Sequence, residues 1–554
     1  MARHSASRSR SAVSRVQMRI QQAAFIALLA LACLLVPGQI GAQVTTSQFD
    51  NARTGANMNE LWLTPQNVNA RQFGRLFTLR VDGDVYAQPL YLPQLGIRGK
   101  GLHNVLFVAT EHDSVYAFDA DGQTAAPLWQ VSFLNRARGV TAVPDADLNC
   151  PLIAPEVGIT STPVIDRTTG TLYVLARTRE PGSAGHPKYV QRLHALDVIS
   201  GAEKFGGPVE IRASVSSPLG PVDFDAHRQN QRSGLLLANG NVYIAWASSC
   251  DCGRYHGWVM AYGAQSLRQV AVFNTSPDDQ QGGIWQSDTG IAADNAGNVF
   301  INVGNGKFDA GAGGRDYGDS VVELNLSARG LSAVDYFTPY NQKHLNDIDL
   351  DLGSGGVLLL PDQPGAHPHL LVTAGKEGVV YMIDRDKMGR FHEGSDSHAV
   401  QTLPASAGGL FAAPAYWNQH VYVTFSEDVL KDFLVQNGRL SAQPAARGKT
   451  KFPYPGATPA VSADGFANGI VWIAASHGWQ LKDVPSVLHA YDAMNVAHEL
   501  YSSEQNSARD RASAAVRFTI PTVINGRVYA GGRRAVDVYG LLPPSTKYKK
   551  SGRK

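Results

Sequence analysis

The feature that most constrains this chain is a repeat of short strand patterns at a spacing of roughly 45 to 60 residues. One complete copy runs from residues 163–165 (PVI) through 171–175 (TLYVL) to 193–203 (LHALDVISGAE). It alternates apolar and polar positions, is rich in β-branched and aromatic residues, and breaks at Gly or Asp, a pattern typical of antiparallel strands. A single four-stranded sheet cannot bury both of its faces, so the repeat predicts sheets that shield one another in a closed ring.

Further copies keep the same order of strands, and we count roughly eight in all, with a weak one near residues 416–425. The clearest lie at residues 105–119, 242–262, 299–324, 370–384 and 471–492. The last copy, at residues 518–539, lacks a strand, whereas residues 74–80 form an early strand without partners. We therefore predict an all-β, eight-bladed β-propeller of four-stranded antiparallel blades, with the N-terminal strand closing the ring in the last blade.

Composition and charge favour a folded body with no nucleic-acid partner. Hydrophobic residues make up 44% of the chain and charged residues 17%, and Gly (55) and Pro (29) are frequent, which suits buried strands joined by tight turns. The formal net charge is only +2, and much of the basic excess lies in the two tails. A nucleic-acid-binding surface would need a basic face on the body of the protein.

The chain divides into four expected regions. Residues 1–42 resemble a signal peptide, with five Arg residues before position 20, an apolar stretch at 23–36 and a small-residue site at 40–42. An uncleaved anchor is the alternative, although the apolar stretch is short for a membrane span. Residues 43–81 form an N-terminal extension with the closing strand, 82–542 the propeller, and 543–554 a basic disordered tail. We expect an exported protein, periplasmic or secreted, with no stable membrane insertion after signal cleavage.

Three cysteines remain after the expected cleavage: Cys150, Cys250 and Cys252. In an oxidising compartment the simplest arrangement is one disulfide and one free thiol. We predict that Cys150 pairs with either Cys250 or Cys252. The spacing of Cys250 and Cys252 is one residue short of a CxxC metal or redox motif, so metal binding there is not expected.

The turn sequence at residues 193–203, with echoes at Asp119 and Asp492, resembles the repeat of pyrroloquinoline quinone (PQQ) β-propellers. The likeness extends over residues 82–542 and implies the eight-bladed quinoprotein alcohol dehydrogenase-like fold, in which PQQ lies near the axis on a bound calcium. The chain also resembles exported bacterial PQQ-repeat proteins of unassigned activity.

The resemblance implies site residues at four motifs. Trp285 (GGIW, 282–285) matches the tryptophan beneath the quinone, and Asn305 (GNG, 304–306) matches the asparagine that gives calcium an amide oxygen. Asp351, or Asp349 if the alignment slips, matches the catalytic aspartate, and Asp351 is also a candidate calcium ligand. Lys376 (GKEG, 375–378) matches the cation beside the quinone oxygens. Hard oxygen ligands suit calcium, and a carboxylate suits proton abstraction.

The chain departs from the family where the second carboxylate ligand is expected. Cys252 falls near that position, and a thiol is a poor calcium ligand. Asp251 would substitute if the loop shifts by one residue. The adjacent Cys-Cys pair that caps the quinone is missing, as is a CxxCH haem site.

Other acidic residues are interpreted as structural. Five loop aspartates could bind calcium, but they lack an EF-hand pattern and we interpret most as solvated turn residues; they are Asp145, Asp147, Asp309, Asp316 and Asp319. Residues 111–113 (EHD) place acid and base types side by side, yet consecutive strand residues point to opposite faces, so we expect them to end a strand.

Two functions follow from this sequence. The favoured one is a non-catalytic binding or scaffold propeller. Its partner would be an unknown exported ligand or protein, and the candidates are a protein, a glycan or another ligand. The alternative is a PQQ- and calcium-dependent quinoprotein dehydrogenase that oxidises an alcohol or sugar, with Asp351 as base, Lys376 beside the quinone, Asn305 on calcium and Trp285 as the floor.

Overall fold

The computed structural model describes residues 42–544. The chain separates into two compact units, Met1–Ala42 and Gln43–Lys554, and only the second is described below. The predicted signal peptide and most of the predicted basic tail lie outside the described residues. Residues 42–544 contain no helix that is long and apolar enough to cross a membrane.

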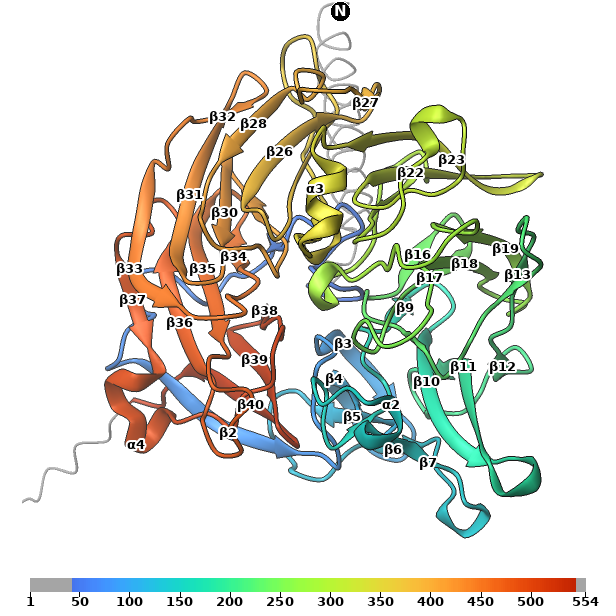
Figure 1. The fold of residues 1–554 in the computed structure, drawn as a ribbon. Coiled ribbons are helices and arrows are strands. Elements are labelled where there is room, and N and C mark those ends of the chain that lie inside the picture. Colours follow the sequence, from blue (N-terminus) through green and yellow to red (C-terminus); the bar gives the residue numbers. More distant parts are fainter. Residues whose placement is uncertain (1–41, 545–554) are drawn as a thin grey trace, which may run out of the picture. The chain divides into compact units, whose positions relative to one another are not determined.

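Within the described residues, strands form eight mainly antiparallel sheets around a common axis, with parallel pairs only at β1–β34 and β23–β27, plus the small hairpin of β13 (Ser214–Val215) and β14 (Val222–Asp223). Figure 1 shows β3, β34 and β38 toward the axis and β6, β37 and β2 toward the rim. The predicted all-β, eight-bladed propeller is confirmed.

The first four blades contain these strands: β3 (Leu90–Ile97), β4 (Gly101–Thr110), β5 (Ser114–Asp119) and β6 (Trp129–Ser132); β9 (Val164–Asp166), β10 (Thr171–Pro181), β11 (Pro187–Asp197) and β12 (Val209–Glu210), extended by β7 (Thr141–Pro144) and β8 (Glu156–Val157); β16 (Leu236–Ala238), β17 (Asn241–Ser248), β18 (Trp258–Gly263) and β19 (Gln269–Asn274), with β15 (Gln229–Asn230); and β20 (Ala292–Ala293), β21 (Val299–Asn302), β22 (Val321–Ser327) and β23 (Gly330–Thr338), with β27 (Arg390–Phe391).

The last four blades contain these strands: β24 (Leu358–Leu359), β25 (Leu370–Ala374), β26 (Val379–Asp384) and β28 (Gln401–Pro404); β29 (Ala415–Trp417), β30 (His420–Thr424), β31 (Asp428–Gln436) and β33 (Ala446–Phe452), with β32 (Arg439–Leu440); β34 (Ala460–Asp464), β35 (Ala467–Ala475), β36 (Val487–Asp492) and β37 (Glu499–Ser502), with β1 (Ala56–Asn57); and β38 (Thr522–Ile524), β39 (Arg527–Gly532), β40 (Ala535–Leu541) and β2 (Phe73–Arg80). The weak copy near residues 416–425 is thus a full blade.

Within residues 42–544 the helices are short and lie in the connections between strands. The α-helices are α2 (Asp145–Leu148), α3 (Gln342–Asp347) and α4 (Ser507–Asp510), and the 3-10 helices are η1 (Arg136–Arg138), η2 (Ser183–Gly185), η3 (Gln286–Asp288), η4 (Ala310–Ala312), η5 (Leu352–Ser354) and η6 (Ser503–Asn506).

The predicted ring closure is confirmed by the eighth blade. Strand β2 pairs antiparallel with β40, from Phe73 opposite Leu541 to Arg80 opposite Ala535. Phe73 is fully buried, and its ring packs against Trp472 of the seventh blade at 5.4 Å between centroids. The two ends of the propeller therefore hold each other, which removes an open sheet edge.

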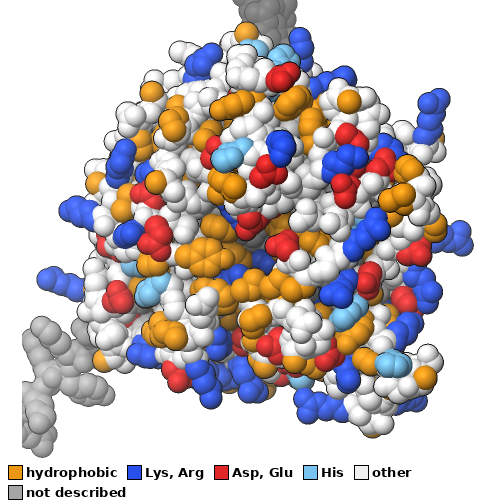
Figure 2. Space-filling view, in the orientation of Figure 1, with side chains coloured by type: hydrophobic (Ala, Val, Ile, Leu, Met, Phe, Trp, Pro, Cys, Tyr) orange, Lys and Arg blue, Asp and Glu red, His pale blue; other side chains and the backbone are white. Residues whose placement is uncertain are grey.

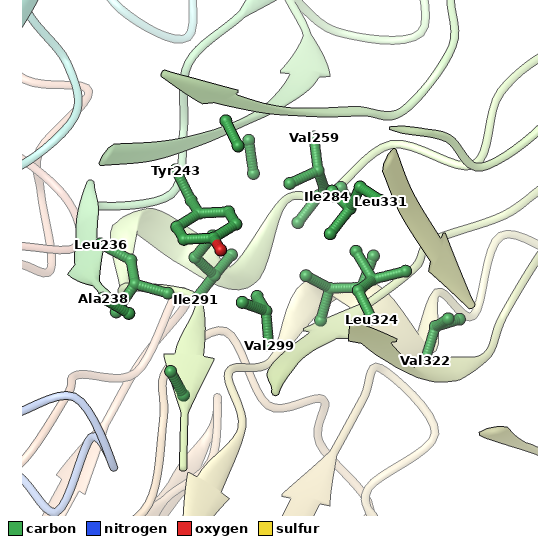
Figure 3. Packing of buried hydrophobic residues seen from close by; sticks show 14 of the residues in the cluster. Leu236, Ala238, Tyr243, Val259, Ile284, Ile291, Val299, Val322, Leu324 and Leu331 are labelled. Carbon is green, nitrogen blue, oxygen red and sulfur yellow. The ribbon is translucent and has the colours of Figure 1, made fainter. Parts of the chain in front are cut away.

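The apolar core lies between neighbouring blades. Figure 3 shows one such layer, in which Tyr243 and Val259 of the third blade face Val299, Val322 and Leu324 of the fourth. These side chains are at most 1% exposed. Because each blade buries one face against the next, no blade has an independent core, and the repeat read from the sequence requires the ring.

A segment that the sequence did not identify runs along the first strands of all eight blades. Residues 44–57, here called the N-terminal belt, make at least one hydrogen bond of 2.7 to 2.9 Å to each first strand; the partners are Tyr91, Ile165, Leu237, Ala293, Leu359, Tyr416, Val461 and Val523. Arg53 of the belt is fully buried and donates to the carbonyl oxygens of Ser47 (2.7 Å) and Ile291 (2.8 Å). The belt therefore fixes the inner strands to one another.

Candidate functional site

The topology of the blades collects the candidate residues on one face of the ring. Asp351 precedes an inner strand, β24, whereas Asn305 and Lys376 follow second strands, β21 and β25. In an antiparallel sheet the beginning of one strand lies beside the end of the next, so these positions share an edge. Figure 2 shows the face that carries α3 hollowed at the centre of the ring, with basic and acidic side chains around the hollow.

A lysine and two aspartates form the centre of this site. The Lys376 ammonium lies 2.5 Å from Asp351 Oδ2 and 2.7 Å from Asp349 Oδ1. Asn305 connects the same two carboxylates, because its backbone N–H donates to Asp351 Oδ1 (2.6 Å) and its amide donates to Asp349 Oδ1 (2.8 Å). Both candidate aspartates therefore belong to one cluster, with Asp351 buried and Asp349 exposed.

The charges in this cluster stabilise each other against burial. Burial disfavours the Lys376 ammonium, but the carboxylates of Asp351 and Asp349 outweigh it and raise the pKa of Lys376 above its ordinary value. Burial raises the pKa of Asp351, and the Lys376 ammonium and the Asn305 N–H offset part of that effect. The site thus holds a buried ion pair of the kind that needs good geometry to persist.

Trp285 lies against the same cluster. A Cβ atom at Gly304 would come within 2.6 Å of Asp351 Oδ1 and 2.9 Å of Trp285 Cδ1, so the missing side chain at Gly304 allows these groups to approach. The indole N–H of Trp285 is buried without a partner among the described residues. All four motifs found in the sequence therefore converge, while their roles in binding or catalysis stay predictions.

Asp319 is a member of the site that sequence reasoning misplaced. We interpreted it as a solvated turn residue, but it is fully buried. Its carboxylate accepts the backbone N–H of Leu352 (3.1 Å), and burial together with Asp351 raises its pKa well above the ordinary value. Asp316 is also fully buried rather than solvated. Their turn-like sequence gave no signal, because burial depends on the neighbouring blade.

Two buried arginines and the aromatic rings beside them form a second group of residues, here called the arginine wall, which the sequence did not suggest. Arg232 Nε donates to Asp288 Oδ1 at 2.6 Å, and both side chains are buried. Arg517 is 2% exposed and stacks between the rings of Trp479 (4.6 Å) and Phe518 (4.8 Å). Its Nε and Nη2 atoms are buried and have no hydrogen-bond partner among residues 42–544.

This wall is continuous with the rest of the site. The Arg232 guanidinium lies 5.2 Å from the Phe518 ring and 6.0 Å from the Trp285 ring. Residues from the third, fourth and eighth blades thus meet near the axis. These residues are far apart in the sequence, so no local motif indicated that they would meet.

The disulfide borders the arginine wall. Cys150 pairs with Cys250, with 5.8 Å between Cα atoms, which selects one of the two predicted pairings. Cys252 keeps a free thiol that is partly exposed. Cys150 and Cys250 line a narrow pocket together with Arg232 and Arg517, so the bridge holds the loop of α2 beside the buried guanidinium groups.

Asp251, which would replace Cys252 as the second carboxylate ligand, lies beside Tyr255, and its role stays a prediction. The Tyr255 hydroxyl donates to Asp251 Oδ1, and the Tyr255 ring meets the edge of Trp285 at 6.1 Å between centroids. Asp251 itself is exposed. It therefore approaches the floor of the site only through the tyrosine.

The described residues gather few hard oxygen ligands for calcium at this site. Calcium takes six to eight oxygen ligands, and the described residues contain no group of three or more His, Cys, Asp or Glu placed to hold a metal ion. Asn305 Oδ1 is buried and free, but Asp351 Oδ2 already faces the Lys376 ammonium. In contrast, Trp285, Lys376 and the two arginines supply the aromatic and cationic surfaces that an anionic ring system requires.

Solved structures share this architecture at low sequence identity. The quinohemoprotein alcohol dehydrogenase ADHIIG from Pseudomonas putida HK5 is 15% identical, with 93% of this chain and 82% of that chain covered and a TM-score of 0.59. The quinohemoprotein alcohol dehydrogenase from Comamonas testosteroni is 14% identical over 90% and 80%, with a TM-score of 0.57. A europium-containing methanol dehydrogenase is 13% identical over 89% and 90%, with a TM-score of 0.55.

The chain thus has the eight-bladed propeller fold of the quinoprotein alcohol dehydrogenases, as the repeat resemblance implied. No protein-family description matches it, and no curated protein does. A likeness of this kind defines the fold and leaves the activity to be argued from the site.

Proposed function

We propose that this protein is a binding propeller that holds a small, flat, carboxylate-bearing ligand in its axial hollow and does not turn it over. The observation that carries the proposal is Arg517, a buried guanidinium with no hydrogen-bond partner among the described residues. Leaving a buried charge unpaired is costly, by several kcal/mol in effective terms. A ligand carboxylate that reached these buried atoms would remove that cost.

The free atoms of Arg517 suit such a ligand. Nε and Nη2 form one edge of the guanidinium, and this edge takes both oxygens of a carboxylate side by side. The rings of Trp479 and Phe518 on either side of Arg517 add flat apolar surfaces. Lys376 supplies a further cation, beside Asp351. A planar ring bearing acidic groups complements this arrangement in shape and charge.

The state of Asp351 favours binding over catalysis. A general base must lie within hydrogen-bond reach of the proton that it removes, and a neighbouring cation lowers its basicity. Both Asp351 oxygens are already engaged, Oδ1 by the Asn305 N–H and Oδ2 by the Lys376 ammonium. The carboxylate therefore acts as the counter-ion of Lys376.

A second candidate is a PQQ- and calcium-dependent dehydrogenase that oxidises an alcohol or sugar. One specific observation favours it: Asn305 Oδ1 is buried, has no partner among the described residues, and belongs to the same cluster as Asp351. The fold shared with quinoprotein dehydrogenases adds support.

PQQ itself is a suitable probe, because it is a flat ring system with three carboxylates. We expect PQQ to quench the tryptophan fluorescence of the protein and to stay bound during desalting in the presence of EDTA. The loaded protein should not reduce an artificial acceptor when alcohols or sugars are added. Arg517→Met should abolish retention without lowering the melting temperature, since Met fills similar volume without a buried charge. Arg329→Met, at an exposed turn, is the matched control.

Two results would decide against the binding proposal. Retention of PQQ only with added calcium, together with acceptor reduction, would establish the dehydrogenase. Failure to retain either PQQ or a simple aromatic dicarboxylate in any buffer would rule out the anionic ligand class.

A further inference from the structure

A groove outside the axial hollow carries an unusual excess of positive charge. It has a volume of about 970 Å³ and is formed by β2, α4, the β39–β40 turn and the loop before β36. Its lining contains two acidic residues, Asp84 and Asp483, and six basic ones: Arg75, Arg80, Lys482, Arg511, Arg533 and Arg534. Figure 2 shows Lys and Arg side chains gathered along the lower edge of this face, in the region of β2 and β40 in Figure 1.

This charge is local to the groove. Six basic and two acidic residues leave an excess of four, whereas the formal net charge of the whole chain is +2. The rest of the protein therefore carries a net negative charge, and general basicity does not account for the groove. Cationic walls around a concave surface concentrate the electric field and attract anions.

Most of these cations lack a carboxylate partner. Arg80, Lys482 and Arg534 make no side-chain hydrogen bond or ion pair with any residue between 42 and 544. Arg511 donates only to the backbone carbonyl of Asp483 (3.1 Å), and Arg533 only to the carbonyls of Ala515 (3.3 Å) and Trp479. Neutral carbonyls orient these guanidinium groups without neutralising their charge, and Asp84 is the acidic residue of the lining that interacts with Arg533.

The turn that carries two of the arginines is held at a conformational cost. Only Arg533 and Arg534 separate β39 from β40, and Arg534 has a φ of +53°. Two-residue hairpin turns favour Gly or Asn in this left-handed region, and other residues lose roughly 1 kcal/mol there. The chain thus keeps an arginine where glycine would be more stable, and the side chain faces the groove.

We propose that this groove is a binding site for a small molecule that carries several oxyanion groups, either phosphates or carboxylates. Arginine forks bind such groups in pairs of hydrogen bonds, and the volume is in the range of small-molecule sites. The groove adjoins the arginine wall, because Arg533 donates a hydrogen bond to the carbonyl of Trp479, and the ring of Trp479 stacks on Arg517. The site is nonetheless separate from the axial hollow and does not depend on the function proposed above.

Binding is measured by calorimetry on the full-length protein with tripolyphosphate and citrate, with acetate as the monovalent comparison. The groove variant combines Arg80→Gln, Lys482→Gln and Arg534→Gly; glycine suits the left-handed turn, so folding should be preserved. The control combines Arg98→Gln, Arg329→Gln and Lys449→Gln, three exposed residues that lose the same total charge.

We expect the groove variant to bind the multivalent anions at least tenfold more weakly and the control variant to bind within twofold of wild type. Wild-type affinity should fall between 50 and 200 mM salt, as expected for ionic contacts. Tighter binding of tripolyphosphate assigns phosphate groups to the ligand, and tighter binding of citrate assigns carboxylates. Equal losses of affinity in the two variants would mean that net charge alone attracts the anions, which would overturn the proposal. A lack of binding at millimolar anion concentrations would overturn it as well.

Discussion

Glu111 offers a quantitative test of how the interior of the ring treats charge. It follows β4 and is 1% exposed; its Oε2 atom accepts the Gly158 N–H (2.7 Å) and the Thr160 hydroxyl (3.2 Å), while Oε1 has no partner among the described residues. Burial raises the pKa of Glu111 from 4.5 to about 8. The two hydrogen bonds oppose this rise, and the negative charges of Asp288 and Asp84 add to it. The carboxyl is therefore largely neutral in the folded protein at pH 7.

The sign of the pH dependence follows from the raised pKa. Between the unfolded and folded values the native state binds more protons, so this group's contribution to stability is greatest below pH 4.5 and is lost as the pH rises to about 8. The full loss corresponds to about 5 kcal/mol, of which about 3.5 kcal/mol develops between pH 5 and pH 8.

Glu111→Gln isolates this effect, because glutamine keeps the size and the acceptor oxygen but does not ionise. We expect the free energy of unfolding of the variant, measured by urea titration relative to wild type, to increase by about 3.5 kcal/mol from pH 5 to pH 8. Groups remote from Glu111 titrate alike in both proteins and cancel in the difference, whereas Asp113, whose pKa the Glu111 charge raises, also changes between them. The exposed Glu393→Gln control should stay parallel to wild type. A parallel curve for Glu111→Gln as well would refute the reasoning.

Three further predictions concern ring closure, the belt and the thiol. Phe73→Ala should lower the free energy of unfolding by about 3 to 5 kcal/mol, because it empties the contact between the closing strand and the seventh blade; an effect below 1 kcal/mol in urea titrations would contradict this role. Arg53→Met should lower the free energy of unfolding by about 3 kcal/mol or more in the same urea titrations, because it leaves the buried carbonyl oxygens of Ser47 and Ile291 without this hydrogen-bond donor. Iodoacetamide should label Cys252 in the protein before any disulfide is reduced. Peptide mapping should find Cys150 and Cys250 labelled only after the disulfide has been reduced.

The sequence alone determined the architecture and part of the site. Alternating strands and turn residues repeat locally, so the number of blades and the closing strand at residues 73–80 could be predicted. Asn305, Asp351 and Lys376 were singled out by the resemblance of their motifs to the PQQ propellers, and the structure brings them together because the ring returns to the same face at every blade.

Only the tertiary structure decided the contacts that cross blades. The belt at residues 44–57, the choice of Cys250 over Cys252, the burial of Asp319 and the unpaired guanidinium of Arg517 depend on which distant segments meet once the ring has closed. Strand patterns arise from interactions within a few residues and are visible along the chain. Burial and pairing of charges are properties of the closed ring, in which residues hundreds of positions apart share one low-dielectric interior.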